Sequence, residues 1–488
     1  MFLKINIARP IIQKLITLVA ISFLSITTCF AKISLPNIFG DNMVLQQKSS
    51  VALWGMSKKS GQVLITTSWD RKNYQAKANA DGKWKLNVNT PTAGGPFEIS
   101  FSDGEKLILK NILIGEVWVC SGQSNMEMSL KGNSSPILNA AEIILNADNP
   151  KLRLFKVKRA TSSTELSELR GDWQESTSET ARDYSALAFQ YGQILQKKLK
   201  VPVGLILSTV GGTIIEAWMS NSSLTTFPEV KIEPTLEGIK DPHKFPTSLY
   251  NGMIAPIAGF GVKGFLWFQG ESNRHNPERY EKYLPAMVAD WRKKWGLGEI
   301  PFYYVQIAPF EAKDKTRSGP RLREAQFNAA KIIPNSGMIS ALDVGMENDA
   351  HFMDKTTLAQ RASYWALGKT YGIKGIGYKS PELNNMKVDS GKAVLTFDNA
   401  PYLTSYRKPM TLFEVAGEDK VFYPASAVIK ANQVTVQSDK VLKPVAVRYA
   451  YKEFVKAELY NNDGLPASSF RTDDWVLPYQ TAKNTANK

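Results

Sequence analysis

Small polar residues follow several apolar segments of this 488-residue chain, and their types are those that acyl-transfer chemistry needs. Ser124 comes two residues after Gly122, in the stretch SGQSNM. A serine close behind a glycine can lie on a tight turn, where its hydroxyl is exposed and its own N–H faces the same space. His351, one of only three histidines, lies after a later apolar segment. We therefore predict Ser124 as a nucleophile and His351 as the base that accepts its proton.

Two further loops supply hydrogen-bond donors for the same site. Gly212 has no side chain to block approach to its N–H, and Asn273 carries a side-chain amide. Together with the N–H of Ser124 they make three donors, which is the composition of an oxyanion hole. Other side chains beside these motifs are candidates to contact a substrate: Gln123, Gln269 and Arg274, with Tyr250, Trp218 and Trp267, for which a core position is the commoner alternative.

The composition argues against several other kinds of site. The three histidines are scattered, and neither a zinc spacing nor a phosphate-binding loop is present, so we predict no metal and no cofactor. Cys120 precedes the Ser124 turn and is predicted to be buried rather than reactive. The net charge is +15, which favours anionic sugars, but the Lys and Arg residues are scattered, so no nucleic-acid partner is predicted.

The elements that must position these residues alternate between apolar runs and stretches of helical period. Such alternation predicts an α/β region with a parallel sheet and helices on both faces. Ligands of such sheets bind beyond the carboxyl ends of the strands, which is where the polar residues lie. The predicted strands are 112–119, 203–210, 262–268, 302–307 and 338–344, and the predicted helices are 187–199, 280–295 and 354–371.

Strand-and-turn patterns flank this region, so we place an N-terminal β domain at 32–111, the catalytic domain at 112–378 and a C-terminal β region at 379–488. In the first of these, Asp81-Gly82 is expected to join strands 74–80 and 83–88 in a hairpin, and Asp103-Gly104 a second pair.

Residues 1–31 have the pattern of a signal peptide, with a basic start, a short apolar run and a small residue at Ala31. A membrane anchor and lipidation at Cys29 are the alternatives. We expect export to the periplasm or beyond, and no membrane span in the mature chain. The oligomeric state stays open.

Several of these motifs in combination resemble one family. GEVWVCSGQSNMEM (115–128), GGTIIEAW (211–218), WFQGESN (267–273) and Asp349-Ala350-His351 resemble the sialate O-acetylesterases, a branch of the SGNH hydrolases. The flanking stretches SLYNGMIAP (248–256) and NNDGLPASSFRTDDW (461–475) look like that family too.

The resemblance implies a flavodoxin-like SGNH hydrolase core flanked by β-rich regions. It implies the same roles for Ser124, Gly212, Asn273 and His351, and acetylated carbohydrate, above all O-acetylated sialic acid, as the substrate. A xylan or other polysaccharide acetylesterase is the alternative, and a carbohydrate-binding protein without activity is another.

The sequence departs from this pattern at one position. Many SGNH enzymes carry an acid three residues before the histidine, where this chain has Asn348. Asp349 stands one residue closer to His351, and we predict it as the group that orients the ring. A backbone carbonyl, Asp343 or Asp354 are the alternatives.

Overall fold

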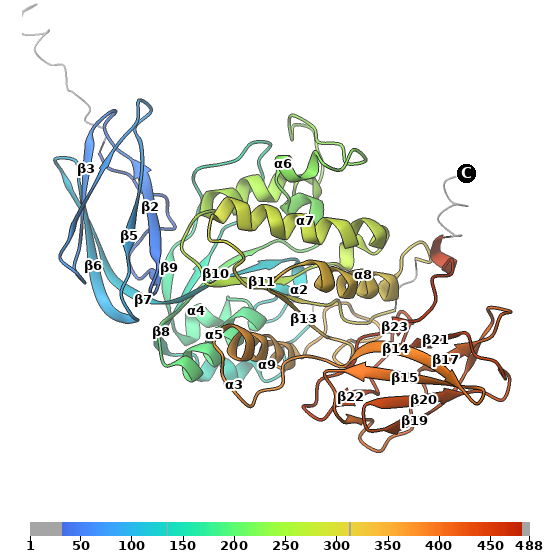
Figure 1. Cartoon of the computed structure of the whole chain (residues 1–488). Coiled ribbons are helices and arrows are strands. Elements are labelled where there is room, and N and C mark those ends of the chain that lie inside the picture. Colours follow the sequence, from blue (N-terminus) through green and yellow to red (C-terminus); the bar gives the residue numbers. More distant parts are fainter. Residues whose placement is uncertain (1–31, 134, 312–313, 481–488) are drawn as a thin grey trace, which may run out of the picture.

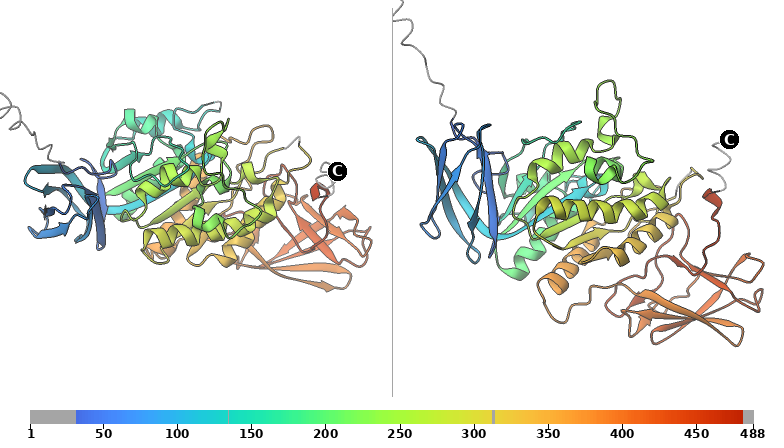
Figure 2. Two further views of the ribbon diagram at one scale, coloured as in Figure 1. Left: turned by 90° about the horizontal axis from the view of Figure 1, so that it is seen from above. Right: turned by 45° about the horizontal axis from the view of Figure 1, so that its top comes forward.

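The computed structural model describes residues 32–133, 135–311 and 314–480, and the predicted signal peptide with Cys29 lies outside the described residues. Three regions lie in a row: a β region from the first part of the chain, a central α/β region and a second β region from the last part (Figures 1 and 2). No helix among the described residues has the length and apolar character needed to cross a membrane.

The central region is built on one sheet, as predicted. Its strands run in the order β13-β12-β11-β7-β10-β8-β9, and all neighbours are parallel except β9, which is antiparallel to β8. Apart from β8 and β9, the remaining five strands have the 2-1-3-4-5 order of flavodoxin-like sheets. The strands are β7 (Lys106–Gly122), β8 (Asn149–Lys156), β9 (Trp173–Ser176), β10 (Val203–Thr209), β11 (Gly264–Phe268), β12 (Phe302–Val305) and β13 (Ser336–Ile339).

Helices cover both faces of this sheet (Figure 1). Along β11, Phe265 and Trp267 face the helices α7 (Pro277–Trp295) and α8 (Gly319–Ile332), while Leu266 and Phe268 face α5 (Ala186–Leu199) and α9 (Lys355–Trp365). Because a strand buried on both faces is apolar throughout, such a run signals a central position in the sheet. The predicted helices correspond to α5, α7 and α9, and α8 was not predicted.

The N-terminal region confirms one predicted hairpin and corrects the other. β6 (Gly94–Ser102) pairs antiparallel with β7 across Asp103-Gly104. The hairpin expected across Asp81-Gly82 is wrong, because β4 (Asn73–Lys77) pairs with β3 (Gln62–Thr67) and β5 (Lys83–Asn89) pairs with β2 (Ser50–Met56). The Asp-Gly turn reverses the chain at a corner between two sheets, and burial of apolar faces, rather than the turn, selects each strand's partner.

β7 connects the N-terminal region to the central region without a linker. Its first half pairs with β6, and its second half lies between β10 and β11. Within the strand, Asn111 has a left-handed backbone (φ 55°), and its side chain binds Asn42 and Glu175. The predicted boundary at residue 111 thus falls inside one continuous strand. The Ser124 turn is thus anchored in both regions.

The C-terminal region is β-rich, as predicted, and its two four-stranded sheets enclose a separate apolar core. The buried Arg323 of α8 joins it to the central region by hydrogen bonds. Arg323 donates to the carbonyl oxygen of Lys452 (2.6 Å) and to Ser469 Oγ (3.1 Å). The sheets consist of β14 (Glu382–Asp389), β15 (Lys392–Asp398), β20 (Gln433–Gln437) and β19 (Ser426–Lys430), and of β18 (Phe422–Pro424), β17 (Phe413–Ala416), β21 (Ala446–Tyr449) and β23 (Phe470–Arg471).

Candidate active site

Ser124 lies directly beyond the carboxyl end of β7, where it begins the short helix α2 (Ser124–Glu127). Gly122 makes the turn possible: its φ is +139°, and a Cβ there would lie 2.1 Å from the carbonyl oxygen of Phe268 in β11. Any other residue would push the two central strands apart. Ser124 is partly exposed, so its hydroxyl is accessible from outside.

His351 lies beside Ser124 in space, although it comes from a late segment of the central region's sequence. Its Nε2 lies 2.8 Å from Ser124 Oγ, although 227 positions separate the two residues in the chain. It stands in the loop between β13 and α9, and its side chain is 31% exposed. This is the separation at which an imidazole can accept a hydroxyl proton.

Asp349 lies on the other side of the imidazole. Its Oδ1 is 3.5 Å from His351 Nδ1 and also accepts the backbone N–H of His351 at 2.7 Å, while Oδ2 accepts the Ser135 hydroxyl. Partial burial acts to raise the pKa of Asp349, but the hydrogen bonds from Ser135 and the His351 N–H outweigh it and leave the pKa below its ordinary value. The carboxylate is therefore ionised at neutral pH.

The other acids considered for this role are engaged elsewhere. Asp343 forms a bidentate pair with Arg361, at 2.7 and 2.6 Å. Asp354 caps α9 by accepting the N–H (3.0 Å) and the hydroxyl (2.6 Å) of Thr357. Asp349 is thus the acid that lies beside the ring.

The predicted oxyanion donors lie at the neighbouring strand ends. Gly211 lies against Ser124, since a Cβ on it would be 3.3 Å from Ser124 Cβ, and its N–H donates to Glu127 Oε2 at 2.7 Å. Gly212 follows with a left-handed φ of +72°, and a Cβ there would have no atom within 4 Å. The N–H of Gly212 therefore belongs to an open position in the loop beside Ser124.

Asn273 is buried, and its amide orientation is set by its partners. Its Oδ1 accepts from the N–H of Ile215 (2.9 Å) and from Gln269 Nε2 (2.7 Å), and its Nδ2 donates to Glu216 Oε2 (2.9 Å). Burial raises the pKa of Glu216, and the hydrogen bond from Asn273 opposes that rise. An amide nitrogen has two hydrogens, and the bond to Glu216 uses one of them.

The three predicted substrate contacts lie inside the protein. Gln123 Oε1 accepts the N–H of Gly270 (3.3 Å), and Gln269 Nε2 donates to the carbonyl oxygen of Thr213 (3.0 Å). Arg274 stacks on the Phe310 ring at 3.9 Å, facing the C-terminal region rather than Ser124. We therefore assign a structural role to Gln123, Gln269 and Arg274, whose side chains bind neighbouring loops. The aromatic candidates Tyr250, Trp218 and Trp267 have no exposed area and belong to the core.

Sequence reasoning missed a buried group of polar side chains behind Ser124. Glu271 accepts a hydrogen bond from Asn125 Nδ2 at 2.5 Å. Lys355 donates to Asn125 Oδ1 at 2.7 Å. No spacing in the sequence indicates this contact, because 230 positions separate Lys355 from Asn125.

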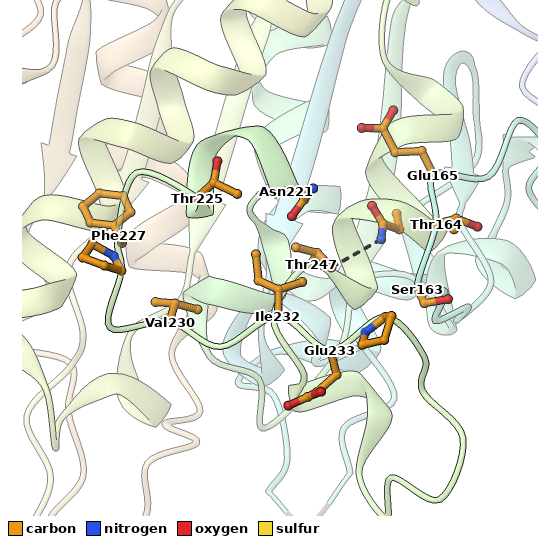
Figure 3. Close-up of a pocket in the computed structure, with 13 residues that line it drawn as sticks. Ser163, Thr164, Glu165, Asn221, Thr225, Phe227, Val230, Ile232, Glu233 and Thr247 are labelled. Carbon is orange, nitrogen blue, oxygen red and sulfur yellow. Dashed lines mark hydrogen bonds between the residues drawn. The ribbon is translucent and has the colours of Figure 1, made fainter.

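Two cavities lie in the central region. One, of about 440 Å³, borders Glu127 and Arg159. The other, of about 740 Å³, is lined by segments 163–165 and 221–234, with Thr247 and Asn251 joined by a 3.3 Å hydrogen bond in its wall (Figure 3). None of the predicted catalytic residues lines this second cavity.

Other chemistry finds no support among the described residues. They contain no group of three or more His, Cys, Asp or Glu side chains placed to hold a metal ion. Cys120 is fully buried, and burial raises the pKa of its thiol. A buried thiol with a raised pKa is a poor nucleophile.

Comparison with known proteins gives consistent matches. A family model described as "Carbohydrate esterase, sialic acid-specific acetylesterase" matches residues 114–371. Sialate O-acetylesterases of Homo sapiens and Pongo abelii are each 29% identical over 481 residues, covering 88% of this chain and 90% of theirs. A crystal structure of a carbohydrate acetylesterase from Xanthomonas citri is 33% identical, covers 91% of this chain and 100% of that one, and superposes with a TM-score of 0.83.

Proposed function

The chain belongs to the family of sialic acid-specific carbohydrate acetylesterases and is a carboxylic ester hydrolase, and we propose that it removes O-acetyl groups from sialic acids through an acyl-enzyme on Ser124. The observation that carries this mechanism is the 2.8 Å separation of His351 Nε2 and Ser124 Oγ. A serine paired with an imidazole is the arrangement used for acyl transfer on unrelated folds.

In the first half of the reaction, Ser124 Oγ attacks the acetyl carbonyl carbon while His351 Nε2 takes the hydroxyl proton. The carbonyl oxygen becomes an oxyanion, which the N–H groups of Ser124 and Gly212 and the Asn273 amide stabilise. The bond to the sugar oxygen then breaks, and His351 returns the proton to that oxygen. The sugar leaves with a free hydroxyl, and the acetyl group stays on Ser124.

In the second half, water replaces the sugar. His351 takes a proton from the water, the resulting hydroxide attacks the acetyl carbon, and the Ser124–acetyl bond breaks as the serine recovers its proton. Acetate is the product. The ionised Asp349, 3.5 Å from His351 Nδ1, stabilises the imidazolium that forms in both halves.

Charges at the edge of the site support an acidic sugar as the substrate. Arg159 is 56% exposed and lies 3.6 Å from Glu127, which in turn holds Gly211 beside Ser124. His243 is close to the same arginine, and burial together with Arg159 lowers its pKa. A guanidinium suits a sugar carboxylate, which sialic acid has and xylan lacks.

A panel of esters tests the proposal. Acetate release would be measured from O-acetylated sialosides and from acetylated xylo-oligosaccharides, with the Ser124→Ala variant as the blank. We expect the sialosides to be cleaved with the higher kcat/KM. Faster cleavage of the neutral xylosides would move the assignment to a polysaccharide acetylesterase, and no acetate from either would favour a binding protein.

We also propose export. The basic start, short apolar run and Ala31 are the support for it. Mass spectrometry of the native protein should find a mature chain beginning near Lys32, and a cytoplasmic protein that retains Met1 would contradict this.

A further inference from the structure

Asn125, the residue after the nucleophile, has side-chain bonds to both of the other loops. It is 1% exposed. Its Nδ2 donates to Glu271 Oε1 (2.5 Å) in the loop that carries Asn273, and to the carbonyl oxygen of Ala350 (3.0 Å), which precedes His351. Its Oδ1 accepts from Lys355 Nζ (2.7 Å) at the start of α9. One amide thus connects the nucleophile, the base and the oxyanion loop.

Lys355 is an unusual partner for this amide, because it is a fully buried lysine. Its Nζ lies 3.5 Å from the centre of the Phe352 ring. Burial lowers the pKa of Lys355 to about 7, while the acidic Glu271, Asp349 and Asp354 act to raise it. A buried ammonium is costly unless opposite charges and hydrogen bonds compensate it. The compensation here comes from the catalytic loops themselves.

Glu271 completes the group from the opposite side. It is 8% exposed, and its Oε2 has no hydrogen-bond partner among the described residues. Across the Asn125 bridge, the acidic Glu271 and Lys355 attract each other. Among the described residues, neither Lys355 nor Glu271 forms a hydrogen bond with Ser124 Oγ or with the His351 ring, so their effect must pass through the loops.

We propose that Lys355 is a positioning residue of the active site, which acts through Asn125 and together with Glu271 to hold Ser124 and His351 at their reactive separation. The inference rests on the proposed function, because it concerns the same serine and histidine. Loss of the lysine would leave Asn125 Oδ1 without its donor and the Glu271 carboxylate without a nearby positive charge. The 124–127 turn and the 349–355 loop would then be free to separate. A misplacement of about 1 Å is enough to lower turnover by about a hundredfold.

The first experiment compares Lys355→Met with Lys369→Met on an aryl acetate. Lys369 is the control, since it is an exposed lysine that donates to the carbonyl oxygen of Ser336, at the opposite end of β13 from the site. We expect Lys355→Met to lower kcat about a hundredfold with KM changed less than about threefold. Lys369→Met should leave both unchanged. A kcat of Lys355→Met within threefold of wild type would overturn the proposal, as would an equal loss in both variants.

A double-mutant cycle then separates positioning from general loss of stability. If Lys355 and Glu271 act as one unit, the combined Lys355→Met and Glu271→Gln variant should be no slower than Lys355→Met alone. Multiplying losses would show two independent roles and would contradict the proposal. If Lys355→Met does not fold, the Asn125→Ala variant tests the proposal instead. It removes the amide between Lys355 and Glu271 and keeps both of these side chains. It should show the same kcat loss with unchanged KM.

The Ser124→Ala variant keeps the two proposals apart. If Ser124→Ala retains activity, the proposed function itself fails. If Ser124→Ala is inactive but Lys355→Met and Asn125→Ala are both fully active, only the positioning role is overturned.

Discussion

The open and the buried sides of the active site are built from different kinds of residue. Ser124, Gly212 and His351 are partly or fully exposed. Asn125, Glu271, Asn273 and Lys355 are at most 8% exposed, and their polar groups bind one another or neighbouring loops. In the proposed function, the residues of the open side contact the ester, and those of the buried side hold Ser124 and His351 in position. Substitutions on the two sides should therefore differ in their effect on stability.

The largest effect is expected on the open side, from Ser124→Ala. It removes the nucleophile, so kcat should fall by about ten-thousandfold or more. A partly exposed turn residue contributes little to the core, so the melting temperature should stay within a few degrees. Ester hydrolysis and a thermal melt measure both. Activity within about tenfold of wild type would exclude Ser124 as the nucleophile.

Asn273→Ala, on the buried side, should affect both properties. Loss of a side-chain oxyanion donor lowers kcat by about a hundred- to a thousandfold. The buried Glu216 carboxylate and Ile215 N–H would also lose a partner, so the melting temperature should fall, unlike that of Ser124→Ala. An effect confined to KM would show that Asn273 binds the ground-state substrate instead.

Two neighbouring residues of the His351 loop, Asp349 and Asn348, should differ in their effect on kcat. Asp349→Asn should lower kcat far more than Asn348→Ala, because Asn348 is exposed whereas Asp349 lies 3.5 Å from the His351 ring. Steady-state kinetics on an aryl acetate compare the two. If Asn348→Ala were the slower variant, the role would pass to that residue or to its loop.

A smaller effect on kcat/KM, confined to acidic substrates, is expected for Arg159 at the edge of the open side. Arg159→Gln should lower kcat/KM about tenfold for O-acetylated sialosides, the usual size for one lost bond to a charged group, and leave a neutral aryl acetate unaffected. Arg71→Gln, at an exposed position in the N-terminal β region, is the control. Equal losses on both esters would remove Arg159 from carboxylate recognition.

Acyl size should give a graded effect. A pocket discriminates one methylene by about ten- to two-hundredfold, so aryl acetate should be cleaved fastest, propionate more slowly and octanoate barely. A chelator should change none of these rates. Faster cleavage of octanoate would require a long apolar channel and would favour a lipase-like function.

The sequence was most informative where the chemistry lies at strand ends. Ser124, Gly212 and Asn273 follow apolar runs, and parallel strands bring their carboxyl ends to one edge, so their proximity was predictable. Gln123, Gln269 and Arg274, which were predicted to contact the substrate, are buried. The period of a strand does not tell whether a polar residue after it points inward. The contact of Lys355 with Asn125 depends on tertiary packing, and no local pattern encodes it.

The same limit applies to the fold. The alternation of apolar and helical segments predicted the parallel sheet and helices α5, α7 and α9. It missed β8, whose first residues are exposed and include Lys151, and β9, a four-residue edge strand. It also missed α8, which carries several charged residues; one of them, Arg323, is buried against the C-terminal region. Buried charges conceal the apolar period on which such predictions depend.

The central claim, a covalent acetyl-enzyme on Ser124, is tested most directly by trapping it. The enzyme would be mixed with an excess of an aryl acetate, quenched in acid during the first turnover, digested and analysed by peptide mass spectrometry. We predict one acetyl group on the peptide that contains Ser124, appearing together with a burst of phenol. The acetyl group should be absent from Ser124→Ala treated in the same way. A wild-type enzyme that turns over with no acetylated peptide, or with the acetyl group on another residue, would contradict the account.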